Sequence, residues 1–308
     1  MNLLVLVKKF AERMPKHQHK YDMLTAIEKE ANVMYWHTDG HIRDILARLP
    51  LQPDFIFHYD IEWRNAFAPI ITGLDKVNIA KGCYVLDIHF HPLQRREYFN
   101  KRAKPDLIFS ASKYPFLRAY PECLSRFQWM PFSINPTIIR DYGLPKNMAY
   151  SLTGMVNERY PFREAVKREM SGIDGFQQFN HPGHKTPYEP GMFINDKYAT
   201  ALNRSKLSFT CGSVGQIPVA KFFEIPGCRS LLLAEPNADV EELGFKDGEH
   251  YAACTSHNVR ERALYYNEHE EERRMLTDKG YSLVHRHHSN AVRAKQFIAM
   301  IEQFIGSN

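Results

Sequence analysis

The segment Lys221-Phe-Phe-Glu-Ile-Pro-Gly-Cys-Arg-Ser-Leu-Leu-Leu-Ala-Glu235 decides the fold that we predict for this chain. Pro218 precedes it and suits the first turn of a helix, where the missing N–H costs nothing. Pro226-Gly227 is typical of a helix end. The apolar run Ser230–Ala234 then predicts a buried parallel strand. The segment therefore predicts a short helix followed by a strand, as in an α/β domain.

The predicted helix carries a cation, Lys221, and a carboxylate, Glu224, in its first turns. A helix N-terminus offers free N–H groups and positive potential to a phosphate, and Lys221 adds a full charge. A carboxylate such as Glu224 can accept hydrogen bonds from two neighbouring hydroxyl groups, as on a ribose. The pair favours a nucleotide site, although a surface ion pair on a core helix is the simpler interpretation of these two residues alone.

A series of short motifs continues this pattern between Tyr198 and Arg293. In order, they are Leu202-Asn-Arg-Ser-Lys-Leu-Ser-Phe209, Lys221-Phe-Phe-Glu224, Glu242-Leu-Gly-Phe-Lys-Asp-Gly248, Gly280-Tyr281 and His287-His-Ser289. The series resembles the nucleotide-sugar-binding half of group 1 glycosyltransferases, specifically the spore-maturation CgeB-like branch. It covers about a third of the chain clearly and the rest loosely.

The resemblance implies the GT-B fold, in which two Rossmann-like α/β domains face each other across a cleft and the C-terminal one binds the donor. It implies domains at 1–146 and 147–288, with a C-terminal helix at 289–308 that returns to the first domain. It also implies that Glu224 holds the donor ribose, and it favours a UDP-sugar as co-substrate. A second family glutamate lies eight residues upstream, where this chain has Gln216, so the identity of the sugar stays open.

Composition describes an ordinary globular protein of 308 residues, long enough for two domains, with a formal net charge of +5. This modest excess suits an anionic donor, an anionic acceptor or a membrane surface, and is too small to imply nucleic acid. We expect no transmembrane segment, and we interpret the N-terminus as a first strand and not a signal peptide. Five scattered cysteines without a CxxC pair predict reduced thiols and a cytoplasmic location. Without DxD or HExxH motifs, we expect no metal and no cofactor.

The N-terminal half alternates strand-like and helix-like segments, which predicts an α/β domain with a parallel sheet. Ligands of such sheets collect at the carboxyl ends of the strands. The predicted strands are Leu3–Val7, Val33–Trp36, Asp54–His58, Tyr84–Asp87, Asp106–Ser110 and Trp129–Phe132.

Three side chains near these strand ends are candidate catalytic residues. Asp60 follows the third strand, and Asp87 and His89 follow the fourth. Carboxylates and imidazoles can take a proton from an acceptor hydroxyl or stabilise charge at the reacting sugar. Asp87 and His89 are two residues apart and would point the same way on a continuing strand. The alternative is an aspartate that caps the next helix, with the histidine paired to it.

The second half supplies the remaining candidates for donor binding. Tyr150–Thr153 predicts a strand, and Gly154 after it lets a ligand approach the backbone. Arg163 lies in the first turn of a helix that starts at Pro161, where a guanidinium can grip a diphosphate. Together with Lys221 it would neutralise the leaving nucleotide in place of a metal ion.

The loop Thr210-Cys-Gly-Ser-Val-Gly-Gln216 adds two further donor-binding candidates, Ser213 and Gln216. Its glycines can bring the backbone against the sugar or the phosphates, although a lone Gly-x-x-Gly is a weak signal.

These observations predict a metal-independent glycosyltransferase, most simply a hexosyltransferase, that moves a sugar from a nucleotide diphosphate to a hydroxyl acceptor. The acceptor can be a glycan, a protein, a coat polymer or a modified DNA base. Two alternatives stay open: a sugar-nucleotide epimerase or hydrolase on the same fold, and a non-catalytic nucleotide-sugar-binding protein of coat assembly. The replacement of the family glutamate by Gln216 is the reason to keep the second.

Overall fold

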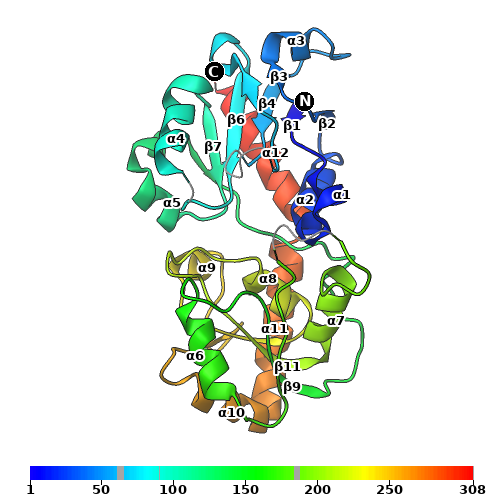
Figure 1. Ribbon diagram of the computed structural model, residues 1–308, viewed down its shortest axis with the longest axis vertical. Coiled ribbons are helices and arrows are strands. Elements are labelled where there is room, and N and C mark those ends of the chain that lie inside the picture. Colours follow the sequence, from blue (N-terminus) through cyan, green and yellow to red (C-terminus); the bar gives the residue numbers. More distant parts are fainter. Residues whose placement is uncertain (61–65, 90, 184–187, 308) are drawn as a thin grey trace. The chain divides into compact units, whose positions relative to one another are not determined.

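The computed structural model describes residues 1–60, 66–89, 91–183 and 188–307 (Figure 1). The chain forms two compact units. Unit 1 comprises Met1–Arg13, Lys20–Pro131 and Arg293–Asn308, and unit 2 comprises Met14–His19 and Phe132–Val292. The division between the units thus falls at Pro131, before the predicted domain boundary at residue 146.

Unit 1 is built on a six-stranded sheet in the order β2-β1-β4-β6-β7-β8, in which every pair is parallel. Its apolar strands are buried on both faces, as expected when helices cover a parallel sheet. The strands are β1 (Asn2–Leu6), β2 (Asn32–Trp36), β4 (Phe55–His58), β6 (Ala80–Val85), β7 (Leu107–Ser110) and β8 (Phe127–Trp129). The last strand therefore ends where the sequence predicted it to begin, at Trp129.

Short helices connect these strands. They are α1 (Phe10–Arg13), α2 (Gln18–Ile27), α3 (Ile42–Leu46), α4 (Pro92–Glu97) and α5 (Tyr114–Ala119), with single turns at Pro15–His17, Leu74–Lys76, Tyr98–Arg102 and Pro121–Arg126. Strands β3 (Gly40–His41) and β5 (Ile71–Thr72) form a separate parallel pair.

The C-terminal helix α12 (Asn290–Gly306) returns to unit 1, as predicted. Its buried Phe297 places its ring centroid 4.7 Å from that of Phe57 on β4 and 4.9 Å from that of Phe109 on β7. Burying one such ring contributes about 1.5–3 kcal/mol. The regular apolar spacing of this helix is therefore explained by packing on the first sheet.

Unit 2 contains a five-stranded parallel sheet in the order β10-β9-β11-β12-β13. The strands are β9 (Met148–Leu152), β10 (Phe176–Gln178), β11 (Ser205–Thr210), β12 (Leu231–Ala234) and β13 (Ala252–Ala253). From β9 the chain first adds β10 on one side and then β11 on the other, so the strand order reverses between β9 and β11. Ligands of open α/β sheets bind at such a reversal, beyond the carboxyl ends of the strands.

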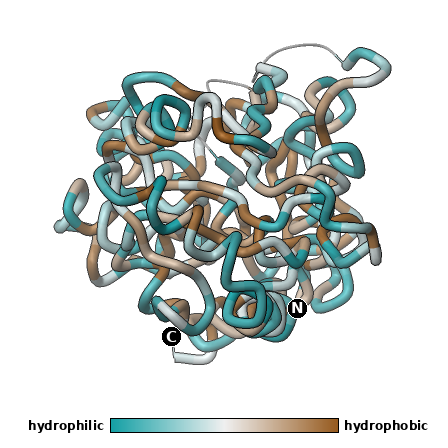
Figure 2. Tube along the Cα trace, turned by 90° about the horizontal axis from the view of Figure 1, so that it is seen from below, coloured by the Kyte–Doolittle hydropathy of each residue, from teal (hydrophilic) through white to brown (hydrophobic). Residues whose placement is uncertain are grey.

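The helices of unit 2 are α6 (Pro161–Met170), α7 (Asn195–Arg204), α8 (Lys221–Gly227), α9 (Ala238–Glu242), α10 (Val259–Glu268) and α11 (Glu270–His287). Two buried apolar clusters lie against the sheet, and apolar and polar stretches alternate along the trace (Figure 2). No helix among the described residues is both long and apolar enough to cross a membrane.

Helix α8 corrects the prediction for Pro218. It begins at Lys221, so Pro218 lies three residues before it and not in its first turn. It ends at Gly227, as expected, but the left-handed residue beyond its end is Arg229, with φ 57°. The absence of a side chain at Gly227 serves packing instead, because a Cβ there would lie 2.7 Å from Cγ2 of Ile139.

Candidate functional site

The loops that leave β9 and β11 bring predicted donor-binding residues together at the strand reversal of unit 2. Gly154 lies two residues beyond β9, and Arg163 lies one turn into the following helix, α6. The loop after β11 leads into α8, whose first residue is Lys221. Sequence positions 67 residues apart, 154 and 221, therefore meet at one edge of one sheet.

Gly154 marks the point where the two cations converge. It adopts φ +95°, and a Cβ placed on it would lie 2.9 Å from Nη1 of Arg163, 3.0 Å from Cε of Lys221 and 3.3 Å from Nζ of Lys221. A side chain at this position would therefore displace both cations and strain the backbone. Only glycine leaves the space between them open.

The structure fixes the guanidinium of Arg163 firmly. Nη1 donates to the backbone oxygen of Met155 at 3.1 Å, and Nη2 donates to Oγ1 of Thr210 at 3.3 Å. The ring of Tyr160 lies below it, 4.0 Å from Cζ. The side chain is buried, Nε has no hydrogen-bond partner, and no carboxylate of the described residues forms an ion pair with it.

Lys221 is a second cation without a carboxylate in ion-pair contact among the described residues. Burial lowers the pKa of its ammonium group to about 8, and the nearby charge of Arg163 acts in the same direction, whereas Glu224 acts against it. Its Nζ lies 5.6 Å from the ring centroid of Tyr198 on α7. Because unpaired buried charge is costly, two such cations side by side favour an anionic ligand between or beside them.

Glu224 lies one turn after Lys221 on α8 and is partly buried. Its Oε2 accepts a hydrogen bond of 2.8 Å from the hydroxyl of Tyr198. Burial, together with this carboxylate, raises the pKa of Tyr198 well above its usual value, so the phenol remains the donor. Oε1 has no partner among the described residues and can accept hydrogen bonds from a ligand.

The loop from Cys211 to Ala220 has the tight backbone that its glycines predict. Ser213 and Gln216 both adopt left-handed conformations, with φ 60° and 56°. The backbone oxygen of Gln216 accepts from Nδ2 of Asn237 at 2.7 Å, and a Cβ on Gly212 would lie 2.7 Å from that same nitrogen. Asn237 thus fixes the loop from the next strand end, while the side chain of Gln216 is exposed.

The three catalytic candidates lie in unit 1. Asp60 follows β4 with φ 25° and is buried. Strand β6 ends at Val85, so Asp87 and His89 do not lie on a continuing strand and the predicted common direction does not apply. Oδ1 of Asp87 instead accepts from the backbone N–H of His89 at 3.1 Å.

A buried arginine fixes this turn after β6. Nη2 of Arg95 donates to the backbone oxygen of Asp87 at 2.8 Å, and Nη1 donates to that of Ile88 at 3.0 Å. The residue that caps α4 is His91, with φ 50°, so Asp87 is not a helix cap either. His89 is exposed and Asp87 partly buried, which leaves both accessible to a ligand.

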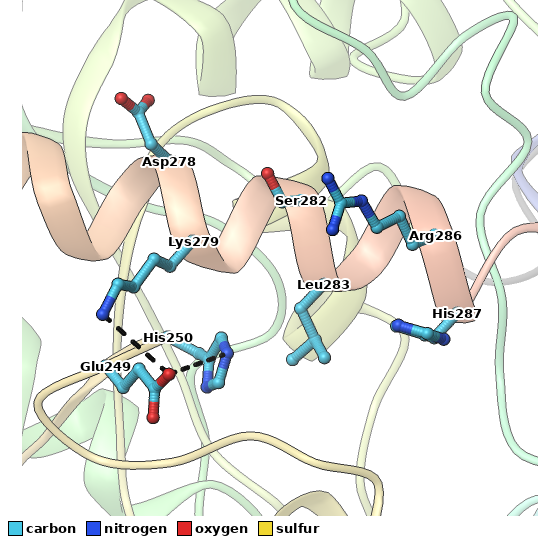
Figure 3. A pocket seen from close by; sticks show the side chains of 8 residues that line it. All are labelled: Glu249, His250, Asp278, Lys279, Ser282, Leu283, Arg286 and His287. Atoms are coloured by element: carbon cyan, nitrogen blue, oxygen red, sulfur yellow. Dashed lines mark ion pairs between the residues drawn. The ribbon is translucent and has the colours of Figure 1, made fainter.

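A separate hollow of about 400 Å³ lies between α11 and the loop that contains Glu249 and His250 (Figure 3). Nε2 of His250 lies 4.0 Å and Nζ of Lys279 lies 3.9 Å from Oε1 of Glu249. None of the predicted site residues lines it. Of its charged side chains, Glu249 pairs with His250 and Lys279, and Asp278 pairs with Arg229, which lies outside the hollow. The predicted donor-binding residues Gly154, Arg163 and Lys221 lie elsewhere in unit 2, beside one another.

Tyr198 and Asn237 are parts of the site to which the sequence assigned no role. Tyr198 opens the series of motifs, but neither periodicity nor spacing indicates that its hydroxyl meets Glu224. Asn237 follows a predicted strand end by three residues, a position typical of a helix cap, and it does cap α9 by accepting from the N–H of Val240.

Residues 162–299 match the family model described as "Glycosyl transferase-like". None of the curated proteins is similar enough to count as a match. Among solved structures, sucrose-phosphate synthase from Thermosynechococcus elongatus superposes with a TM-score of 0.68 at 10% identity, covering 100% of this chain and 99% of that one. HepE from Anabaena, in complex with UDP and glucose, gives 0.64 at 9% identity, covering 98% and 100%. A glycosyltransferase from Rickettsia africae gives 0.64 at 11% identity, covering 100% and 99%.

The likeness to these solved structures confirms the predicted GT-B fold, and residues 162–299 are similar to a glycosyl transferase-like family. The family match begins at Phe162, one residue before Arg163, and includes Lys221 and Glu224. The group 1 assignment is supported, whereas the CgeB-like branch stays a prediction.

Proposed function

We propose that this protein is a glycosyltransferase that transfers a hexose from a UDP-sugar to a hydroxyl-bearing acceptor. The donor class is supported by the cluster around Gly154 and by HepE, a protein of the same fold that was crystallised with UDP-glucose. A hydroxyl-bearing acceptor is what a glycosyltransferase-like domain would use. Candidate acceptors are glycans, proteins, coat polymers and modified DNA bases.

One observation carries the proposal: Arg163 and Lys221 converge on Gly154 with no carboxylate in an ion pair with either. A pyrophosphate supplies the negative charge that the two cations need, and the open space at Gly154 admits it close to the backbone. Arg163 is immobilised by Met155 and Thr210, so binding costs little rearrangement of this side chain.

The roles of the two cations in the reaction follow from where charge develops. When the bond between the sugar and the diphosphate breaks, negative charge grows on the leaving phosphate oxygen. Arg163 and Lys221 stabilise that charge, so they accelerate the step as well as bind the donor. Ser213 and Gln216, in the rigid loop after β11, contribute backbone and side-chain contacts to the sugar or phosphates.

Glu224 recognises the ribose. Its Oε2 is engaged by Tyr198, and its Oε1 accepts from a ribose hydroxyl. We assign Asp87, His89 and Asp60 of unit 1 to catalysis at the acceptor. Asp87 or His89 takes the proton from the attacking hydroxyl.

The direct test is calorimetric binding of UDP, UDP-glucose and uridine to the wild-type protein and to Lys221→Met. We expect UDP to bind much more tightly than uridine to the wild type, because the pyrophosphate meets both cations. Lys221→Met should reduce this preference by at least about tenfold. Equal affinities for UDP and uridine in the wild type would refute the donor site.

Turnover is tested separately, by following release of UDP from UDP-glucose with and without a panel of hydroxyl acceptors. Acceptor-dependent release supports transfer. Release or epimerisation without any acceptor would favour the hydrolase or epimerase alternative, and tight binding without release would favour a non-catalytic nucleotide-sugar-binding protein.

A further inference from the structure

The strongest unassigned feature is the way Tyr198 contacts both members of the clamp on α8. Its hydroxyl donates to Oε2 of Glu224 at 2.8 Å, and its ring lies 5.6 Å from Nζ of Lys221. One side chain from α7 is therefore shared between the residue that we assign to the phosphates and the residue that we assign to the ribose.

Lys221 and Glu224 are three residues apart on one helix, a spacing at which opposite charges readily pair. Glu270 and Arg273, also three residues apart on one helix, α11, form an ion pair of 3.8 Å in this chain. Among the described residues, Lys221 and Glu224 form none. The carboxylate is turned to the tyrosine hydroxyl instead.

The tyrosine itself is fixed by a row of aromatic rings. Phe193 packs edge-on against Tyr198 at a centroid distance of 5.8 Å, and Phe179 stacks on Phe193 at 4.6 Å with an angle of 4° between the rings. Phe193, just before α7, thus packs its ring against that of Tyr198 and is itself stacked on Phe179. A fixed donor competes well for a carboxylate because it loses little conformational freedom on forming the bond.

We propose that Tyr198 is a positioning residue that holds Glu224 away from Lys221, so that the clamp does not neutralise itself before the donor binds. Without the hydroxyl, Glu224 turns to Lys221 and forms an ion pair. That pair removes both the cation that meets the phosphates and the oxygen that meets the ribose. This inference rests on the proposed donor site and specifies how the site is kept open.

Inorganic pyrophosphate distinguishes this role from a simple ribose contact, because it has no ribose. Tyr198→Phe keeps the ring, its edge-on contact with Phe193 and its contact with Lys221. We expect it to weaken pyrophosphate binding, measured by calorimetry, by at least about fivefold, because Glu224 then competes for the cation. Glu224→Gln should leave pyrophosphate affinity unchanged or raise it.

The decisive variant is the double substitution Tyr198→Phe with Glu224→Gln. It should restore pyrophosphate affinity to within about twofold of the wild type, since a neutral side chain cannot capture Lys221. Tyr142→Phe is the matched control: its hydroxyl donates to Oδ1 of Asp196 on the same helix at 3.3 Å, without touching the clamp. This control should bind pyrophosphate like the wild type.

A ligand-free measurement separates this inference from the donor site. Acetic anhydride at pH 8 acetylates Lys221, and mass spectrometry measures the rate. This rate should fall in Tyr198→Phe, because an ion-paired ammonium group loses its proton less readily. It should recover in the double variant. Unchanged acetylation in Tyr198→Phe, or an equal loss of pyrophosphate binding in the single and double variants, would overturn the inference. Failure of the wild type to bind pyrophosphate or UDP would refute the donor site, while acetylation would still decide the role of Tyr198.

Discussion

Replacing Lys221 by methionine should make the free protein more stable while weakening its binding of UDP. Burial and Arg163 lower the pKa of this ammonium group from 10.5 to about 8. At about 1.36 kcal/mol for each pKa unit, the charged form is destabilised in the folded protein by about 3 kcal/mol. Methionine has a similar length and carries no charge, so Lys221→Met should recover a large part of that amount.

The pH dependence gives the sign of the effect. The folded pKa lies below the unfolded one, so below about pH 8 lysine is charged in both states and the full cost is present. Between about 8 and 10.5 the folded protein releases the proton and the cost disappears. The stability advantage of Lys221→Met should therefore be greatest at pH 7 and should vanish near pH 10.5.

The assay is thermal unfolding of the wild type and Lys221→Met at pH 7, 8.5 and 10, with and without UDP. Lys167→Met is the control, because Lys167 is exposed on α6 in the same unit. We expect a higher midpoint for Lys221→Met at pH 7 without ligand, and a UDP-induced rise only in the wild type and the control. A Lys221→Met protein that is less stable than the wild type at pH 7, or an advantage independent of pH, would refute the reasoning.

Three further outcomes are expected. Gly154→Ala should lower the free energy of unfolding by about 1 kcal/mol or more and weaken UDP binding, because residue 154 has φ +95° and the added Cβ would lie 2.9 Å from Nη1 of Arg163. Thermal unfolding measures the first effect and calorimetry the second. An unaltered affinity for UDP would contradict the proposed donor site. The double variant Asp87→Ala/His89→Ala should reduce kcat at least about a hundredfold with donor KM nearly unchanged; an equal rise in donor KM would place these residues in donor binding instead. Since Arg163 and Lys221 neutralise the charge of the diphosphate, the initial rate of UDP release should not change when EDTA is added. A loss of rate in EDTA that added Mg²⁺ restores would show that a metal ion shares the neutralisation of the diphosphate.

The sequence predicted the parts of the fold that depend on local pattern. The short buried run Leu231–Ala234, bounded by turn signals, favours a strand in a parallel sheet, and the apolar spacing around Phe297 favours a packed helix. Helix ends were less certain. Pro218 suits a first turn, but the chain uses it in the loop and starts α8 at Lys221, because a proline is tolerated equally well in both places.

Of the candidate site, the sequence predicted only those residues whose charge or whose glycine backbone suggests a role in binding. Arg163, Lys221 and Gly154 were selected from residue type and position, and the structure places them together. The bond between Tyr198 and Glu224 was not foreseeable, since it joins residues of two helices whose relative rotation depends on packing. The predicted strand through Asp87 was wrong for a similar reason: β6 ends at Val85, and Arg95, eight residues after Asp87, donates to the backbone oxygen of Asp87 in a turn.

Helix α12 has a consequence for how the protein is made. The rings of Phe57 and Phe109 belong to strands that are synthesised before those of unit 2, whereas the ring that packs against both, Phe297, is synthesised after them. While unit 2 is being translated, the apolar surface of the first sheet that Phe297 covers in the folded protein is still exposed. During this period the exposed surface can bind chaperones or aggregate. Unit 2, whose strands β9 to β13 all lie within residues 148–253, has no such delay and can complete its sheet first.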